Sequence, residues 1–508
     1  MAKYLASVIC VALAVGAPLT AIAADRPNVV LILADDLGYN DISLHGNTRV
    51  RTPNIDAIGR EGVWFTRGHT TAPVCAPSRA GLMTGRNQQR FGFEFVPGPA
   101  QLFINLAGGA ENLRNRGAIV PDPPPGGRTP PSEQGIPESQ MNLAEFLKTQ
   151  GYATGIFGKW HLGTGAKYIP PNRGFDEYMW GGGAKFGPDG DPDFVEARFP
   201  WSTIDTAVWR MLPFAMNDGK KSVTPDEDMT TFQARQGVKF IEAHKDEPFF
   251  LYMPFFAPHI PIQAPKSYYD RLEHIADHKT RVYYAMIECL DDSVGMITGK
   301  LKELGLDENT LVIFTSDNGA AEYTRIPDTN QPFRGSKLNY YQGGVVVPYL
   351  MRWPQGLPAG KVFHPPVSQM DVFPTIAAAV GAPLPDGEPI VDGVNLLPYL
   401  SDEKQGAPRA GIVWRSGRYK AVLYGDYRLQ IDENQNKTVL YNIKEDIGER
   451  HNLAQSHPDT VELLKGVLER AESKFVKPMW QTPFYTALPV DIWPNGPPEG
   501  AERMYFGG

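Results

Sequence analysis

The stretch Asn28-Val29-Val30-Leu31-Ile32-Leu33-Ala34-Asp35-Asp36-Leu37-Gly38 decides the fold of this chain. The run up to Ala34 is β-branched and aliphatic without a break, which predicts a strand buried on both faces of a mostly parallel sheet. Such sheets place their ligand sites beyond the carboxyl ends of the strands, where Asp35 and Asp36 follow. Two adjacent acids repel each other unless a cation or a basic group neutralises them, so the pair indicates a bound hard metal. A solvated turn is the alternative.

Three further apolar runs predict strands that bring polar residues to the same edge of the sheet. Residues 311–315 end at Ser316-Asp317-Asn318, residues 152–157 lead to Lys159 and His161, and residues 248–257 lead to His259. The acid and the amide at 317 and 318 join the two acids of the first strand, and this oxygen donor set suits calcium or magnesium and not zinc. An Asx turn that closes the strand is the alternative for these two residues.

The basic residues after the other two strands are candidates for a site. Lys159 and His161 alternate along an extended chain and so point to the same side of it. Gly158 and Gly163 flank them, which indicates close backbone packing at a strand end and favours a site over two surface residues. His259 stands in Pro258-His259-Ile260-Pro261, where a structural role is common, but its place after a central strand makes it a candidate acid.

Composition excludes some classes of protein. The chain has 508 residues, of which 42% are hydrophobic, so it can bury a large core. Its formal net charge is -8 and it has no long run of lysine and arginine, which argues against a nucleic-acid-binding protein. An anionic substrate would therefore be attracted by a local positive pocket and not by the whole surface.

The first residues, 1–23, are typical of a signal peptide. Lys3 supplies the positive charge, residues 5–19 form an apolar stretch, and Ala21-Ile22-Ala23 is a small-x-small cleavage site. A transmembrane anchor is the alternative, but Gly16 and Pro18 interrupt the short apolar run. No other stretch is apolar and long enough to span a bilayer. We therefore expect an exported protein, periplasmic or secreted, without a membrane anchor.

Cys75 lies in Val74-Cys75-Ala76-Pro77-Ser78-Arg79, just ahead of a run of good helix formers. This places its side chain at a helix N-terminus, where backbone N–H groups and the dipole favour an anion or a nucleophile. A small buried side chain is the alternative. Only Cys289 accompanies Cys75 in the mature chain, too few cysteines for a disulfide framework, so we expect Cys75 to be kept for its chemistry.

The order of the predicted elements gives the fold class. We expect an α/β protein with a large, mostly parallel sheet sandwiched by helices over residues 24–406, and a smaller C-terminal α+β domain over residues 407–508. Residues 97–136 are rich in proline and glycine and predict a long surface loop that borders the substrate pocket. The remaining predicted elements are helices at 141–150, 371–380 and 459–475, and strands at 345–350, 419–424, 427–431 and 439–443.

Five separated blocks together resemble one known family. They are Ala34-Asp35-Asp36-Leu37-Gly38, Cys75-Ala76-Pro77-Ser78-Arg79 with Thr84-Gly85-Arg86, residues 158–163, Ala257-Pro258-His259, and Ser316-Asp317-Asn318-Gly319. In this order, and over most of the mature chain, they resemble the formylglycine-dependent sulfatases of the alkaline-phosphatase-like superfamily. Leu440-Tyr441-Asn442 and residues 449–454 resemble the signature of that family's second domain.

The resemblance implies a modified residue and a metal. Cys75 would be oxidised to formylglycine by a separate maturation enzyme that reads Cys75, Pro77 and Arg79. Calcium, in preference to magnesium, would be held by four residues, with residue 75 also facing the ion: Asp35, Asp36, Asp317 and Asn318. Arg79 would hold the modified side chain, and four further residues would surround the sulfate: Lys159, His161, His259 and Lys337.

The chemistry that the resemblance implies is hydrolysis of a sulfate ester. One hydroxyl of the hydrated aldehyde attacks sulfur, and the cation favours its deprotonated form. His259, aided by Lys337, is expected to protonate the leaving oxygen, while Arg79, Lys159 and calcium stabilise negative charge. His161 is expected to take the proton of the second hydroxyl, so that sulfate is released and the aldehyde returns.

Two departures from the family pattern concern substrate recognition. The chain has Gln342-Gly343-Gly344 where relatives often carry Glu-Gly-Gly, and Trp180-Gly181-Gly182-Gly183 offers no serine or threonine. We expect a carbohydrate sulfate ester as substrate, with aryl sulfates as surrogates. The aromatic residues that are candidates for stacking on the substrate are Trp180, Phe186, Trp201, Tyr340 and Tyr341.

Two alternative functions stay open on the sequence. A phosphoester or phosphonate-ester hydrolase would use the same formylglycine and metal, because a tetrahedral oxyanion site distinguishes sulfate from phosphate mainly by charge. A non-catalytic binder of sulfated glycans would keep the fold without the reaction.

Overall fold

The structure is a computed structural model that describes residues 26–385, 387 and 389–507. The predicted signal peptide, residues 1–23, lies outside the described residues. Over the described part of the chain, no helix has the length and apolar character that crossing a bilayer requires.

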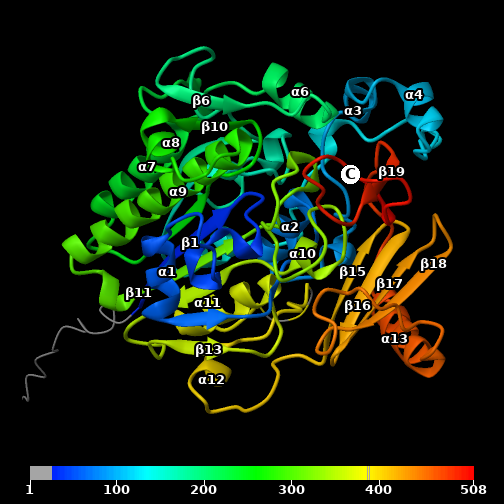
Figure 1. Ribbon diagram of the computed structural model, residues 1–508. Coiled ribbons are helices and arrows are strands. Elements are labelled where there is room, and N and C mark those ends of the chain that lie inside the picture. The colour runs from blue at the N-terminus through cyan, green and yellow to red at the C-terminus, as the bar shows by residue number, and fades with distance from the viewer. Residues whose placement is uncertain (1–25, 386, 388, 508) are drawn as a thin grey trace, which may run out of the picture.

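A ten-stranded sheet forms the centre of the molecule (Figure 1), in the order β13-β2-β12-β11-β1-β9-β4-β5-β7-β8. Its central five strands run parallel: β11 (Thr310–Ser316), β1 (Asn28–Ala34), β9 (Phe249–Pro254), β4 (Ala153–Lys159) and β5 (Glu177–Gly181). The outer strands are β12 (Tyr349–Arg352), β2 (Val63–Phe65), β13 (Lys361–Phe363), β7 (Met216–Asn217) and β8 (Ser222–Val223). The expected α/β class is confirmed.

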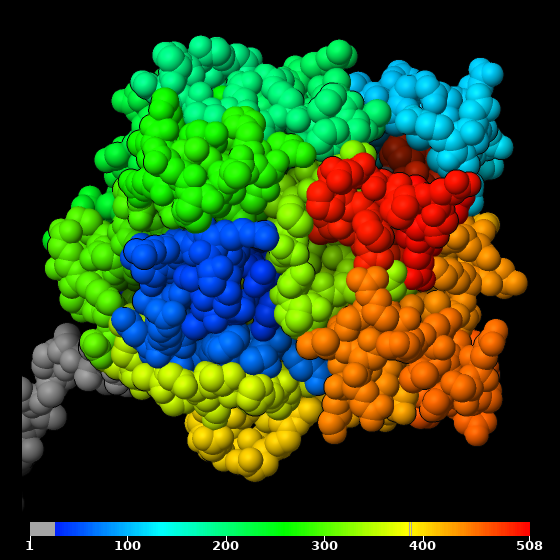
Figure 2. Space-filling model, viewed as in Figure 1, coloured from blue at the N-terminus to red at the C-terminus, as the bar shows by residue number. Residues whose placement is uncertain are grey.

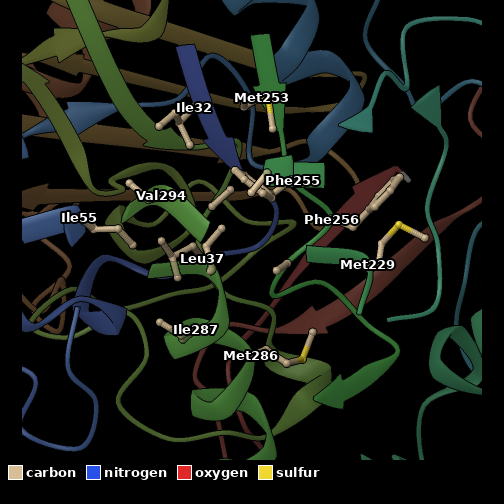
Figure 3. Packing of buried hydrophobic residues seen from close by; sticks show 14 of the residues in the cluster. Ile32, Leu37, Ile55, Met229, Met253, Phe255, Phe256, Met286, Ile287 and Val294 are labelled. Carbon is tan, nitrogen blue, oxygen red and sulfur yellow. The ribbon is translucent and has the colours of Figure 1, made fainter. Parts of the chain in front are cut away.

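The central strand β1 is fully buried because helices cover both faces of the sheet. Val30 and Ile32 face one hydrophobic cluster, whereas Leu31 and Leu33 face another. The first cluster receives α1 (Pro53–Arg60), α7 (Met229–Ala243) and α9 (His278–Glu303), and Figure 3 shows Ile32 packed in it with residues of these helices. The second receives α2 (Cys75–Thr84), α5 (Leu143–Thr149) and α11 (Val372–Ala379). Burial on both faces explains why β1 is apolar at every position.

The C-terminal region forms a separate antiparallel sheet with a helix. Its elements are β15 (Gly411–Ser416), β16 (Tyr419–Tyr424), β17 (Tyr427–Asp432), β18 (Lys437–Asn442) and α13 (Pro458–Glu472). One face packs on α13, and the other places Trp414 and Tyr419 in the same hydrophobic cluster as Val74 and Cys75. The last strands, β19 (Tyr485–Pro489) and β20 (Arg503–Gly507), pair with each other, and Phe506 joins that cluster. The predicted boundary between residues 406 and 407 stays a prediction.

The structure corrects two expected elements. Residues 97–136 are not a single long loop, because α3 (Ala100–Leu106) and α4 (Ala110–Asn115) form inside them; the prolines stand before the first helix and after the second, where they are tolerated. The strand expected at 345–350 begins only at Tyr349, and α10 (Gln342–Val345) precedes it. Its apolar residues suit either state, so periodicity alone could not separate them.

The other short elements connect these layers. They are β3 (Gly68–His69), α6 (Thr203–Met211), β6 (Phe194–Ala197), β10 (Ile262–Pro265), α8 (Lys266–Arg271), β14 (Val367–Ser368) and α12 (Leu397–Leu400). In Figure 2 the red C-terminal tail lies beside the cyan segment that carries α3 and α4, consistent with the hydrogen bond from the Ile119 N–H to the carbonyl oxygen of Tyr485.

Candidate active site

The structure brings every sequence-predicted site residue to one edge of the central sheet. The acids follow the ends of β1 and β11, Lys159 ends β4, His259 follows β9, and Cys75 begins α2. Lys337 comes from the loop between β11 and α10. The expected meeting of strand ends therefore occurs, as the parallel order of these strands requires.

Arg79 joins three of these elements from a fully buried position. Its Nε lies 2.9 Å from Oδ2 of Asp317, and its Nη1 donates to the carbonyl oxygen of Lys159 at 2.8 Å. Burial would lower the pKa of the guanidinium, but the charges of Asp317 and Asp35 outweigh it and raise that pKa. Arg79 is therefore a fixed positive charge that ties α2 to the ends of β11 and β4.

Two lysines neutralise the adjacent acids of β1. Nζ of Lys159 lies 2.6 Å from Oδ2 of Asp35, and Nζ of Lys337 lies 2.9 Å from Oδ2 of Asp36. Burial would raise the pKa of Asp36, but the neighbouring positive charges, that of Lys337 first, outweigh it and hold the pKa below its ordinary value. Asp36 is therefore ionised at neutral pH, as a metal ligand must be.

Two buried oxygen atoms without hydrogen-bond donors indicate that a cation fits this site. Oδ1 of Asp35 and Oδ1 of Asn318 are buried and accept no hydrogen bond. A buried acceptor without a donor is costly, and a bound cation would satisfy both oxygens. Ligand atoms of Asp35, Asp36, Cys75 and His259 all lie within 4.8 Å of one another. This cluster fits a hard cation that prefers oxygen ligands.

The proposed ligand set and this cluster overlap without being identical. Asp317 adjoins the cluster, because its Oδ1 accepts a hydrogen bond of 3.2 Å from the backbone N–H of Asp36, while its Oδ2 is engaged by Arg79. Asn318 donates to Oδ1 of Asp36 at 2.7 Å. His259 was not predicted as a ligand. Its Nε2 lies 3.7 Å from Oδ2 of Asp36, so its place in the cluster follows from its contact with that acid.

Cys75 is buried at the first turn of α2, with 4% of its surface exposed. Burial raises the pKa of its thiol, although the charges of Lys159 and Lys337 oppose the shift. An unmodified Cys75 is therefore a protonated thiol at neutral pH, and a thiol is a weak nucleophile compared with a thiolate.

Both histidines are neutral at neutral pH. Burial, followed by the charges of Lys159 and Arg79, holds the pKa of His161 well below its ordinary value. Burial lowers the pKa of His259 to about 3. Nδ1 of His259 lies 2.6 Å from the carbonyl oxygen of Ile260, so Nδ1 carries the hydrogen and Nε2 is unprotonated.

Backbone strain marks the same site. Asp36 and His161 have φ angles of 65° and 61°, a left-handed conformation that is uncommon for residues other than glycine. Such strain persists only where the surrounding structure enforces it, and it is concentrated at functional sites. At Gly158 an added Cβ would lie 1.9 Å from the carbonyl oxygen of Pro254, which confirms the close backbone packing expected there.

A cavity of about 370 Å³ opens from these groups. Its charged end is formed by Cys75, Lys159, His161, His259 and Lys337. Tyr323 also lines the cavity, and its hydroxyl donates a hydrogen bond of 3.2 Å to Oδ2 of Asp36. No motif surrounds Tyr323, so it was not predicted from the sequence. None of the described residues expected to stack on the substrate lines the cavity: Trp180, Phe186, Trp201, Tyr340 and Tyr341.

The Sulfatase family model matches residues 27–382. The chain belongs to the sulfatase family. It is 32% identical to the N-acetylgalactosamine-6-sulfatase of Rattus norvegicus over 82% of this chain and 73% of that protein. It is also 32% identical to the steryl-sulfatase of Mus musculus, over 75% of this chain and 66% of that protein.

Solved structures share this fold, among them the PsFucS1 sulfatase from Pseudoalteromonas sp., with a TM-score of 0.67 and 24% identity over 89% of this chain and 92% of that one. The crystal structure of Ps i-CgsB in complex with k-i-k-neocarrahexaose is similar with a TM-score of 0.74 and 30% identity, over 90% of this chain and 95% of that one. This sulfatase is therefore an enzyme that hydrolyses sulfate esters, and the family expected from the sequence is confirmed.

Proposed function

We propose that this sulfatase hydrolyses sulfate monoesters through a formylglycine at position 75, with calcium bound beside it. The observation that carries the proposal is the buried convergence on Cys75 of two ionised lysines, a fixed guanidinium and a cluster of oxygen ligands. A protonated thiol is a weak nucleophile, which supports modification of Cys75.

The chain's own charges suit the sulfate group. The charges of Asp35 and Asp36 outweigh burial and raise the pKa values of Lys159 and Lys337, so both ammonium groups stay charged at the cavity. Fixed positive charges in a buried site stabilise the negative charge that grows on sulfuryl oxygens in the transition state. Lys159 and Lys337 are therefore the proposed sulfate-binding residues, with Arg79 behind them.

Two groups that the chain acquires complete the site. Calcium would be held by Asp35, Asp36, Asp317 and Asn318, and when bound it supplies positive charge that favours ionisation of a neighbouring hydroxyl. The hydrated formylglycine supplies one hydroxyl as the nucleophile and a second whose deprotonation allows sulfate to be released.

The two histidines have separate proposed roles. His161 is neutral and has a buried Nδ1 without a hydrogen-bond partner, so this nitrogen is free to act as the base. Because the pKa of His161 is held well below its ordinary value, uptake of the proton depends on the negative charge that the substrate brings. His259 must first take up a proton at Nε2 before it can protonate the leaving oxygen, and the ammonium of Lys337 stands beside it as a charged donor. The role of His259 as acid therefore depends on a substrate whose sulfate adds negative charge to the site.

Export, the maturation enzyme and the substrate belong to the proposal as well. Residues 1–23 support export to the periplasm or beyond, where a sulfated small molecule or glycan would be met. A carbohydrate ester stays the expectation from the sequence. The names of the relatives do not indicate which alcohol carries the sulfate group in the substrate. One relative is named for an N-acetylgalactosamine sulfate and another for a steryl sulfate, and both have the same sequence identity to this chain.

Peptide mass spectrometry on residues 68–79 tests the proposal, using protein produced with a formylglycine-generating enzyme. We expect the mass of CHO in place of CH2SH at residue 75. Cys75→Ala should abolish turnover of 4-nitrophenyl sulfate while the thermal unfolding midpoint stays within a few degrees. An unmodified thiol in protein that turns over, or faster turnover of 4-nitrophenyl phosphate mono- or diesters, would reject the proposal.

A further inference from the structure

The cavity becomes apolar as it leaves the charged end, beginning with one face of α6. Ile204, Ala207, Val208 and Met211 line it, and their i, i+3, i+4, i+7 spacing places them on one side of the helix. Ile204 is 45% exposed and Met211 is 42% exposed. Large apolar side chains gathered on a concave surface are typical of a surface that an apolar ligand covers.

The rest of the apolar cavity wall comes from two distant parts of the chain. α3 and the residue after it contribute Phe103, Leu106 and Ala107, and the C-terminal tail contributes Phe484 and Leu488. α3 packs beside α6, and in Figure 1 the red C-terminal tail lies just below them. Three separate segments thus present hydrocarbon to the same space.

Polar groups that could bind a sugar are scarce along this wall. Among the described lining residues beyond the charged end, only Thr203, Thr486 and Tyr323 carry polar side chains, and the hydroxyl of Tyr323 is bonded to Asp36. A sugar ring presents several hydroxyls, and each one buried without a partner costs free energy. A glycan with further sulfate groups would also need further cations, and the lysines among the described lining residues both stand at the charged end.

We propose that the alcohol half of the substrate is apolar, either an aryl alcohol or a fused alicyclic one. Its sulfate lies between Lys159 and Lys337, and its hydrocarbon lies against α6, α3 and the C-terminal tail. The cavity volume of about 370 Å³ is within the range of small-molecule sites, which favours one compact ligand over a polysaccharide chain. This inference rests on the proposed function and replaces the carbohydrate alcohol with an apolar one.

Binding to the inactive Cys75→Ala variant tests this choice without turnover. Isothermal titration calorimetry would compare 2-naphthyl sulfate with glucose 6-sulfate. We expect the naphthyl ester to bind at least about tenfold more tightly, because its rings leave water for an apolar wall. Equal binding, or tighter binding of the sugar ester, would overturn the proposal.

Substitutions on α6 show whether the preference arises at this wall. Adding Ile204→Gln and Met211→Gln to the Cys75→Ala protein keeps the size of the side chains but makes them polar, and we expect the ratio of the two dissociation constants to fall about tenfold. Arg210→Gln is the matched control, because Arg210 is exposed on the same helix and does not line the cavity. A ratio that responds equally to both changes would contradict the inference.

A second pair of variants, on α3, and a separate turnover assay keep the test decisive if the α6 variant does not fold. If circular dichroism shows that the α6 variant is unfolded, Leu106→Gln on α3 takes its place, with Leu102→Gln as control, since Leu102 is 40% exposed and lies outside the lining. Turnover of 4-nitrophenyl sulfate by the formylglycine-bearing enzyme is measured separately. No turnover with a retained naphthyl preference would reject the proposed function and leave this inference standing.

Discussion

Oε2 of Glu449 accepts a hydrogen bond of 2.7 Å from the backbone N–H of Gln342. This contact joins the C-terminal region to the first turn of α10, directly after the loop that carries Lys337. Arg428, fully buried under the same region, has its Nε 3.7 Å from Oε1 of Glu449 and makes no hydrogen bond. Glu449 thus lies against a buried guanidinium and holds the loop of Lys337, the proposed sulfate-binding lysine, although burial raises the pKa of its carboxyl to about 7.

Glu449→Ala should therefore destabilise the protein and impair catalysis. It removes the carboxyl nearest to the buried Arg428 guanidinium, and loss of one partner of a buried pair is destabilising. We expect a thermal midpoint lower by several degrees and a lower kcat/KM on 4-nitrophenyl sulfate, both measured beside Glu449→Gln, which keeps an acceptor for Gln342. A kcat/KM unchanged in folded Glu449→Ala protein would show that the contact does not position Lys337.

Calcium removal should lower stability and activity together. A chelator should reduce the thermal midpoint, and added calcium should restore it, because a ligand at about one hundred times its Kd stabilises a fold by about 2.7 kcal/mol. Asn318→Ala, which removes a proposed ligand oxygen, should shrink this calcium-dependent shift. The exposed Asn172→Ala is the control. A thermal unfolding midpoint that changes neither with chelator nor with added calcium would rule out a calcium site.

His259→Ala should discriminate between leaving groups. Loss of an acid matters most when the departing alkoxide is poorly stabilised, so we expect a loss of about 100-fold or more on an alkyl sulfate and about tenfold or less on 4-nitrophenyl sulfate. The two kcat values, measured at saturating substrate, give the comparison. Equal losses on both esters would argue against His259 as the acid.

Asp41 should make stability depend on pH. Burial raises its pKa to about 7, even though Tyr283 donates a hydrogen bond of 2.6 Å to its Oδ2. Between pH 4 and 7 the folded chain keeps a proton that the unfolded chain has released, so unfolding is increasingly favoured as pH rises. The resulting loss is about 4 kcal/mol at most by pH 7.

Asp41→Asn removes this titration while Oδ1 of the amide can still accept from Tyr283. The unfolding free energy of the variant minus that of the unchanged protein, from denaturant titrations, should increase from pH 4 to pH 7 and then level off. A difference that stays constant over this range would show that Asp41 is ionised in the folded protein.

Much of the fold was predictable because its signals are local. β1 and β11 are buried on both faces, so their apolar runs stand out, and the acids that follow them mark the sheet edge at which Asp35 and Asp317 meet. The sequence also placed the motif residues at the correct edge of the central sheet. α3 and α4 were missed because proline and glycine dominate the composition around them.

The walls of the cavity could not be predicted, since they depend on tertiary contacts alone. Ile204 and Phe484 are far apart in the chain and belong to no motif, yet they line the same space. Tyr340 and Tyr341, which looked suited to stacking on a substrate, are fully buried against the C-terminal sheet instead. Aromatic composition alone could not distinguish side chains that line a binding cavity from side chains that pack in the protein interior.

The cluster that joins Cys75 to Trp414 and Phe506 also sets an order of events in biosynthesis. Trp414 and Phe506 are synthesised long after Cys75, and the cluster around residue 75 is complete only once they have packed against it. An enzyme that modifies Cys75 as proposed would therefore reach the side chain most readily in the nascent or unfolded polypeptide. In a fully folded precursor the same side chain would be reached only through the cavity that it lines.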